Sequence, residues 1–348
     1  MDLKNVTIGY VPYVKNLLHP GDRRRFPHFA KLNDVPFEIA DLNKKYDVVL
    51  ITPHSDLSAW LKYRKKHPGT KFIFEMVDSM IFSSDLFRSL FKGVGRYITS
   101  KESKLNFDYK KPIVNWIRMA DAVICSSTEL ENIIKPLNKN VFVSLDYYFE
   151  AKYRKSDYEI KGKMKLVWEG QSVVLKNLLA FKDVFAAINQ FCELHIITDL
   201  HFTKIGSLIK VDTQKIINKF PITSHLHEWK YGENYKLLST FDCGIIPINK
   251  KSPMAWHKPA NKLISFWFTG MPTIVSNTPA YVEVMKNAGN DLSCDTKDEW
   301  IKRITEVKNM SAEKRRQLAD QNFAFAQTHF SEEALSKEWQ KLFDHVLK

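Results

Sequence analysis

Two lysines at a predicted helix start are the residues of this chain best suited to hold a phosphate group. Lys258 and Lys262 open the segment HKPANKLISFWFTG (257–270), where Pro259 suits the first turn of a helix and Gly270 suits its C-terminal cap. The helix dipole disfavours a positive charge in the first turn by about 0.3–1 kcal/mol, and a bound anion would reverse that penalty. The alternative is that both lysines extend into water.

A second basic helix start follows the strand-like run KLVWEG. The run ends at Gly170, and after a short loop the segment 176–191 has apolar residues at helical spacing. Unpaired backbone N–H groups at this helix start, joined by the ammonium group of Lys176, would surround a phosphate. A solvated lysine beside a tight turn is the alternative. Further along, Trp229 or Tyr231 would either lie against a nucleotide base or simply pack.

The elements that must position these residues form two series. Apolar strand-like runs alternate with helical spacing, which predicts α/β domains with parallel sheets. The alternation breaks in the charged stretch KYRKSDYEIKGK (152–163) and then resumes. We therefore expect Rossmann-like domains over 1–155 and 156–330, followed by an amphipathic helix over 331–348.

Composition limits the classes of protein that this chain can belong to. With 348 residues, 44% of them hydrophobic, the chain is a folded protein rather than a disordered one. It shows no signal-peptide pattern and no apolar run of roughly 20 residues, so we expect a cytoplasmic protein. The four cysteines lack metal-ligand spacing. The net charge of +13 favours polyanionic partners: nucleic acid, an anionic membrane surface or phosphorylated small molecules.

The C-terminal half resembles the donor domain of GT-B glycosyltransferases, most closely those of the family 4 or group 1 type. The matching pieces are WEG…LKN, LHIITD, FDCGIIPI, KPANKLISFWFTGMPTIVS and AYVEVM; the N-terminal half matches more loosely, in ADAVICSSTELENII and NVFVSLDYY. The resemblance implies a GT-B fold, in which two Rossmann-like domains face a central cleft. It also implies that the C-terminal helix packs back on the first domain.

Carried over position by position, the resemblance implies a site for a nucleoside-diphosphate sugar. Lys176 would neutralise the diphosphate, with the backbone near Gly170 and Gln171 beside it and Lys262 as its companion. Lys258, Trp229 and Ser265 complete the expected donor-binding set, and no cofactor is implied.

The sequence departs from the family at two positions. Members often carry two glutamates eight residues apart, where this chain has His257 and Ser265. Ser265 would hydrogen-bond a ribose hydroxyl, and His257 would contact the sugar or the diphosphate.

The resemblance places the acceptor against loops that follow the N-terminal strands. Candidates there are His19, Arg23, Arg24 and His54, whose charges suit a phosphate on a lipid-linked or sugar-phosphate acceptor. A solvated charge run is the alternative for the arginines.

Carboxylates at the end of the strand-like run FEMVD are further candidates for the acceptor side. Glu75 and Asp78 are placed to contact an acceptor hydroxyl, and Asp78 is the preferred group. The alternative role of Asp78 is to cap a helix.

By resemblance, the reaction is hexosyl transfer with retention of anomeric configuration. The expected catalytic residues are Asp78, His257 and Lys176; positioning and electrostatic stabilisation of the leaving diphosphate would supply most of the rate. The sequence has no DxD motif, and we expect no metal. The mixed apolar and basic segment 85–111 would lie on an anionic membrane surface or pack on the sheet.

Three functions are compatible with these features. The first is a glycosyltransferase of bacterial surface polysaccharide or lipopolysaccharide synthesis, and the second is a catalytically silent partner subunit, suggested by the missing glutamates. The third is a nucleic-acid-binding protein, suggested by charge alone; because the chain has no recognised module, nucleic acid is not an expected partner.

Overall fold

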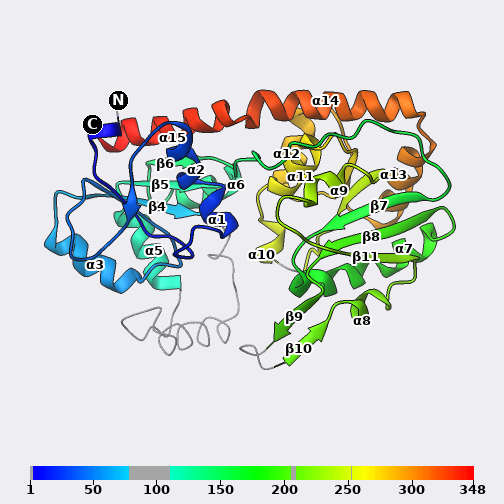
Figure 1. Ribbon diagram of the computed structural model, residues 1–348, viewed down its shortest axis with the longest axis horizontal. Coiled ribbons are helices and arrows are strands. Elements are labelled where there is room, and N and C mark those ends of the chain that lie inside the picture. The colour runs from blue at the N-terminus through cyan, green and yellow to red at the C-terminus, as the bar shows by residue number, and fades with distance from the viewer. Residues whose placement is uncertain (1–2, 78–109, 205–208, 252) are drawn as a thin grey trace. The chain divides into compact units, whose positions relative to one another are not determined.

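The computed structural model describes residues 3–77, 110–204, 209–251 and 253–348 (Figure 1). Contacts divide the chain into two units. Unit 1 comprises Met1–Tyr147, His257–Pro259 and Ser331–Lys348, and unit 2 comprises Tyr148–Trp256 and Ala260–Phe330. Each unit contains a six-stranded sheet whose neighbouring strands are all parallel. The predicted class of two parallel-sheet α/β domains is confirmed.

The sheet of unit 1 has the order β2-β1-β3-β4-β5-β6. Its strands are β1 (Ile8–Tyr10), β2 (Glu38–Ile39), β3 (Val48–Ile51), β4 (Lys71–Met76), β5 (Ala122–Cys125) and β6 (Val141–Val143). The central strands β3 and β5 are buried along their whole length, because helices cover both faces of a sheet of this kind. The strand order reverses between β1 and β3.

The helices of unit 1 include one from the C-terminal end of the chain. Among the described residues they are η1 (Leu3–Asn5, a 3-10 helix), α1 (Pro20–Arg23), α2 (Phe26–Leu32), α3 (Leu57–Lys66), α5 (Lys110–Met119), α6 (Thr128–Ile134) and α15 (Glu332–Val346). Ser331 caps α15, and its hydroxyl accepts a hydrogen bond from the N–H of Ala334. Trp339 and Phe343 of α15 are fully buried against Phe26 and Phe29 of α2, with ring centroids 5.8–5.9 Å apart. This aromatic cluster holds the helix in unit 1.

The sheet of unit 2 has the order β11-β8-β7-β12-β13-β14. Its strands are β7 (Met164–Glu169), β8 (Cys192–Thr198), β11 (Ser224–Glu228), β12 (Cys243–Ile246), β13 (Thr273–Ser276) and β14 (Ser293–Cys294). An antiparallel hairpin, β9 (His201–Lys204) and β10 (Ile209–Asp212), leaves the series after β8. The sequence pattern did not predict this hairpin or the two-residue strand β14.

The helices of unit 2 differ from the predictions at both basic helix starts. They are η3 (Ser172–Phe181, a 3-10 helix), α7 (Lys182–Ile188), α8 (Gln214–Ile217), α9 (Asn234–Leu238), α10 (Pro253–Trp256), α11 (Asn261–Phe268), α12 (Pro279–Asn287), α13 (Lys297–Asn309) and α14 (Ala312–Phe330). Lys176 therefore lies inside a 3-10 helix and not at a helix start. Ala260 is the N-cap of α11, so Lys262 is in the first turn while Lys258 precedes the helix. Gly270 has a φ of +70°, as its predicted capping position requires.

Two further features bear on the sequence-based expectations. All four cysteines are free and buried. Among the described residues, no helix combines the length and the apolar composition that a membrane-spanning segment needs.

Candidate functional site

The strand order of unit 2 reverses between β7 and β12. In open α/β sheets, ligands bind beyond the carboxyl ends of the strands at such a reversal. Gly170 directly follows β7, and the connection after β12 leads to α11 with Lys262 in its first turn. The fold therefore brings these two predicted donor-binding residues to the same edge of the sheet.

Lys262 lies against the end of β7. Its ammonium group donates a hydrogen bond to the carbonyl of Glu169, and its Nζ lies 3.3 Å from Oε2 of the same residue. The Nζ is also 5.4 Å from the ring centroid of Trp168. A Cβ on Gly170 would lie 3.1 Å from this Nζ and 2.7 Å from two carbons of the Trp168 ring. Only glycine lets the lysine and the indole approach the strand end this closely.

Glu169 is a member of this site that the sequence analysis did not single out. Its carboxylate and Lys262 are both about one-quarter exposed. An anion that binds Lys262 must compete with this carboxylate or displace it. The signal was present in the sequence, since Glu169 belongs to the WEG motif.

The other expected donor-binding residues are distributed along the same edge. Gln171 is the exposed N-cap of η3. Trp229 follows β11 and is half-buried, and its backbone N–H donates to the carbonyl of Thr198 over 3.0 Å. Ser265 is buried, and its hydroxyl donates to the carbonyl of Lys262 over 2.8 Å. Lys176 is exposed and makes no hydrogen bond or ion pair with another residue in the described part of the chain.

His257 groups with unit 1, as do Lys258 and Pro259. Its Nδ1 is in close contact with Oε1 of Glu129, in the first turn of α6. Both side chains are about one-fifth exposed. Glu129 belongs to the segment ADAVICSSTELENII, and nothing in the sequence identifies it as the partner of His257.

The strand order of unit 1 reverses between β1 and β3, and rings gather beyond these strands. The ring of Tyr13 lies 4.8 Å from that of His19, nearly parallel to it, and 4.7 Å from that of His54. Asp22 lies buried behind them and accepts hydrogen bonds from the Tyr10 hydroxyl and the Tyr13 N–H, each over 2.8 Å. Two of the expected acceptor-side residues, His19 and His54, are thus brought together on Tyr13.

The arginine triplet does not act as one basic patch. Arg25 is wholly buried; its Nε donates to Glu75 over 2.5 Å and its Nη1 to the Ser144 carbonyl over 2.7 Å. Although burial lowers the pKa of Arg25, Glu75 and Asp146 raise it above its usual range. Burial raises the pKa of Glu75, opposed by Arg25.

The expectation that Glu75 meets an acceptor hydroxyl is wrong, because its side chain is 0% exposed and paired with Arg25. The neighbours of Arg25 in the triplet are less enclosed. Arg23 and Arg24 are half-buried, and Arg23 donates to the Leu18 carbonyl over 2.8 Å. Asp78 and most of the segment 85–111 lie outside the described residues.

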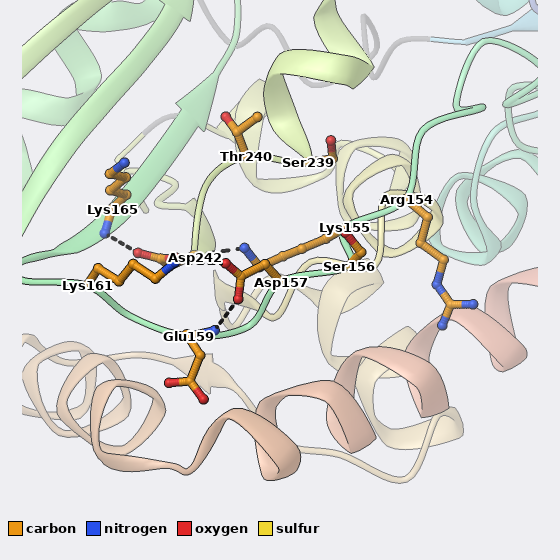
Figure 2. Close-up of a pocket in the computed structure, with 10 residues that line it drawn as sticks. All are labelled: Arg154, Lys155, Ser156, Asp157, Glu159, Lys161, Lys165, Ser239, Thr240 and Asp242. Carbon is orange, nitrogen blue, oxygen red and sulfur yellow. Dashed lines mark hydrogen bonds and ion pairs between the residues drawn. The ribbon is translucent and has the colours of Figure 1, made fainter.

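A polar pocket of about 430 Å³ lies at the other edge of the unit 2 sheet (Figure 2). Lys165, near the start of β7, and Asp242, just before β12, line it; Asp242 accepts a hydrogen bond from the Lys165 N–H over 2.8 Å. Figure 2 shows Lys155 reaching the same carboxylate, with a separation of 3.7 Å. Because it lies at the amino ends of the strands and its charges pair internally, this pocket is not the candidate donor site.

Comparisons with known proteins agree with this architecture. Neither a protein-family model nor a curated protein matches the sequence. Among solved structures, the chain is similar to HepE of Anabaena in complex with UDP and glucose, with a TM-score of 0.65 and 10% identity over 98% of this chain and 100% of that one. It is also similar to sucrose-phosphate synthase of Thermosynechococcus elongatus, with a TM-score of 0.61 and 13% identity over 87% and 74%.

A third similar structure is TarM of S. aureus, with a TM-score of 0.59 and 12% identity over 85% of this chain. The chain spans 54% of the length of TarM. At such identities the likeness concerns the fold. Two six-stranded parallel sheets and these neighbours together show that the chain has the GT-B glycosyltransferase fold.

Proposed function

We propose that this protein is a glycosyltransferase that moves a sugar from a nucleoside-diphosphate sugar to a glycan or lipid-linked acceptor. The observation that carries the proposal is the position of Lys262 beside Gly170, at the strand-order reversal of unit 2. The similar HepE structure holds UDP and glucose, which favours a nucleotide sugar as the donor.

In the proposed mechanism, unit 2 stabilises the leaving diphosphate. Lys262 exchanges its contact with Glu169 for the phosphate oxygens, and the first-turn N–H groups of α11 add their dipole. These groups stabilise the charge that develops on the diphosphate in the transition state more strongly than they stabilise the bound donor in the ground state. This difference accelerates the reaction. Lys176 supplies a second cation from η3.

We propose that the sugar is transferred with retention of configuration and without a metal. In such a transfer the departing diphosphate remains on the face that the acceptor attacks, so no strong dedicated base is required. His257, held by Glu129, contacts the sugar or the diphosphate in this scheme. The anomeric configuration of the product, read by NMR, tests this part of the proposal.

We further propose bacterial surface polysaccharide or lipopolysaccharide synthesis as the setting, with peripheral contact to an anionic membrane face. The net charge of +13 supports the membrane contact. Co-sedimentation with vesicles that do or do not contain anionic lipid, at low and high salt, tests it.

Calorimetry with UDP, GDP and ADP tests the donor site. We expect the wild type to bind at least one of them, and Lys262→Ala to weaken that binding about 10- to 150-fold, the loss of one charged hydrogen bond of about 1.5–3 kcal/mol. Lys286→Ala, which removes an exposed lysine from α12 of the same unit, is the matched control and should bind normally. A protein that binds no nucleotide, or a Lys262→Ala variant that binds as the wild type does, contradicts the proposal.

A catalytically silent partner subunit is the second candidate. The observation that favours it is the presence of His257 and Ser265 at the two positions where the resemblance to the glycosyltransferase family implies glutamates. This candidate predicts nucleotide binding, if any, without hydrolysis or transfer of any nucleotide sugar. A screen of nucleotide sugars for turnover separates the two.

A further inference from the structure

Three histidines and a glutamate lie on one face of the unit 2 sheet, away from the candidate donor site. His195 on β8 and His225 on the edge strand β11 are direct neighbours in the parallel register. Successive side chains of a strand alternate between faces, so Glu193 joins His195, and His227 joins His225, on the same face. The register of two strands therefore fixes the whole cluster.

The ligand-type atoms of this cluster are spaced as around a metal ion. The Nε2 of His195 lies 3.1 Å from Oε1 of Glu193, and the Nε2 of His225 lies 3.4 Å from Oε2 of the same carboxylate. One ligand atom from each of these three residues lies within 4.8 Å of the others. Ligands of a tetrahedral zinc ion, with metal bonds of about 2.0–2.2 Å, are separated by about 3.3 Å. Small side-chain shifts would therefore close the site.

His227 contacts the ring nitrogen of His195 that points away from Glu193. Its Nε2 lies 2.9 Å from the Nδ1 of His195. With Nδ1 engaged by His227, the Nε2 of His195 is directed at Glu193, and metal-binding histidines are commonly oriented by such an outer partner. The ring of Phe241 packs 4.7 Å from that of His195 and forms the apolar side of the cluster.

The exposure of these residues also suits a metal. The side chain of His195 is 10% exposed, that of Glu193 21% and that of His225 44%. The cluster is thus anchored in the sheet and open on the His225 side, where water can take a fourth position.

We propose that Glu193, His195 and His225 bind a zinc ion that cross-links β8 to the edge strand β11. Two imidazoles and one carboxylate form a ligand set that zinc accepts. His195 is three residues before Thr198, the carboxyl end of β8, which places the ion about 10 Å from that edge. At that distance from the candidate donor site, the ion ties the edge strand β11 to β8 and takes no part in the proposed sugar transfer.

Zinc binding to chelator-treated, untagged full-length protein tests the proposal. Competition with a chromophoric chelator should show one zinc ion per chain, with a Kd in the micromolar range or tighter. His225→Ala and Glu193→Gln should each weaken binding at least tenfold. His201→Ala, which removes an exposed histidine from β9 of the same unit, is the control and should bind like the wild type.

A thermal-shift measurement gives a second readout that is independent of enzyme activity. Zinc should raise the Tm of the wild type and of His201→Ala, and should leave the Tm of His225→Ala unchanged. His225 is nearly half exposed, so its removal should leave the fold intact, which circular dichroism verifies. The proposal is overturned if the wild type binds no stoichiometric zinc, or if His225→Ala binds zinc as tightly as the wild type.

Discussion

At the carboxyl edge of unit 2, a lysine lies against a glycine and a strand-end carbonyl; at the corresponding edge of unit 1, rings lie over a buried aspartate. Lys262 and Gly170 form the first edge, and Tyr13, His19 and His54 form the second. The first presents a cation and backbone groups, which suit the diphosphate common to all nucleotide sugars. The second presents ring faces and imidazole nitrogens, the groups that the proposed function assigns to the acceptor.

The two edges also use charge differently. In unit 2 the charge of Lys262 is partly exposed, whereas in unit 1 Arg25 points inward and joins Glu75 and the Ser144 carbonyl behind the ring cluster. The same class of residue after a strand can therefore bind a ligand or hold the loops that bind it. Burial decides between these roles, and the sequence of a basic triplet does not show which of its side chains are buried.

The largest effect is expected for Arg25→Ala, which tests whether buried charge holds the edge of unit 1. The substitution leaves Glu75 buried without its partner, and we expect the free energy of unfolding to fall by about 3–5 kcal/mol in urea denaturation. Arg64→Ala is the matched control, because Arg64 pairs with Asp121 in a partly exposed ion pair; it should change stability by about 1 kcal/mol or less. If the two variants are equally stable, the buried arginine contributes no more to stability than the partly exposed one, and the proposed structural role of Arg25 is contradicted.

A pH dependence is expected from unit 2. The folded-state pKa of His195 is lowered from 6.5 to about 4, so the neutral form stabilises the fold above pH 6.5 and this contribution is lost as the pH falls toward 4. Between pH 7.5 and pH 5 we expect a loss of up to about 2 kcal/mol. Glu193, His225 and His227 are the titratable groups that face His195. Urea denaturation at the two pH values measures the loss of stability, and His195→Gln should make stability depend less on pH.

Gly170→Ala should weaken nucleotide binding about tenfold, or about 1.4 kcal/mol. The added Cβ would approach the Trp168 ring to 2.7 Å and displace Lys262 from the strand end. Gly69→Ala, where a Cβ meets no atom within 4 Å, is the control. Unchanged binding by Gly170→Ala would mean that the close approach of the lysine is not needed at this edge.

The smallest effect is expected for His54→Ala in unit 1. With an acceptor identified by screening, its KM should rise a few-fold while the Kd of the nucleotide stays unchanged, because the change removes one ring of the Tyr13 cluster. His67→Ala, at the C-terminal end of α3, is the control on the same unit. A change in nucleotide binding instead would show that the two edges do not divide the substrates as proposed.

The sequence predicted most of the architecture and part of the candidate site. Apolar runs identified the strands of both six-stranded sheets except β14, and they missed the separate hairpin β9–β10; these strands are short or polar and carry little periodic signal. The spacing of Gly270 and Pro259 located α11 to within two residues. The prediction that an α-helix starts at Lys176 was wrong, because apolar spacing does not distinguish a 3-10 helix from the start of an α-helix.

Partners across the chain could not be predicted. Arg25 and Glu75 are 50 residues apart, and Glu129 and His257 are 128 apart, so only the folded chain brings them together. The sequence identified Lys262 and His54 as residue types suited to binding. It did not show that Lys262 contacts Glu169, or that His54 lies on Tyr13.

The placement of α15 has a consequence for how the protein is made. The sheet of unit 1 is complete once Val143 has been synthesised, yet Phe26 and Phe29 are covered by Trp339 and Phe343 of α15. At about 5–20 residues per second, a ribosome needs about 10–40 s to make the intervening chain. During that time the nascent unit 1 exposes its aromatic surface. Binding by a chaperone at this stage, or aggregation when the message is cut short before α15, would follow from the order of synthesis alone.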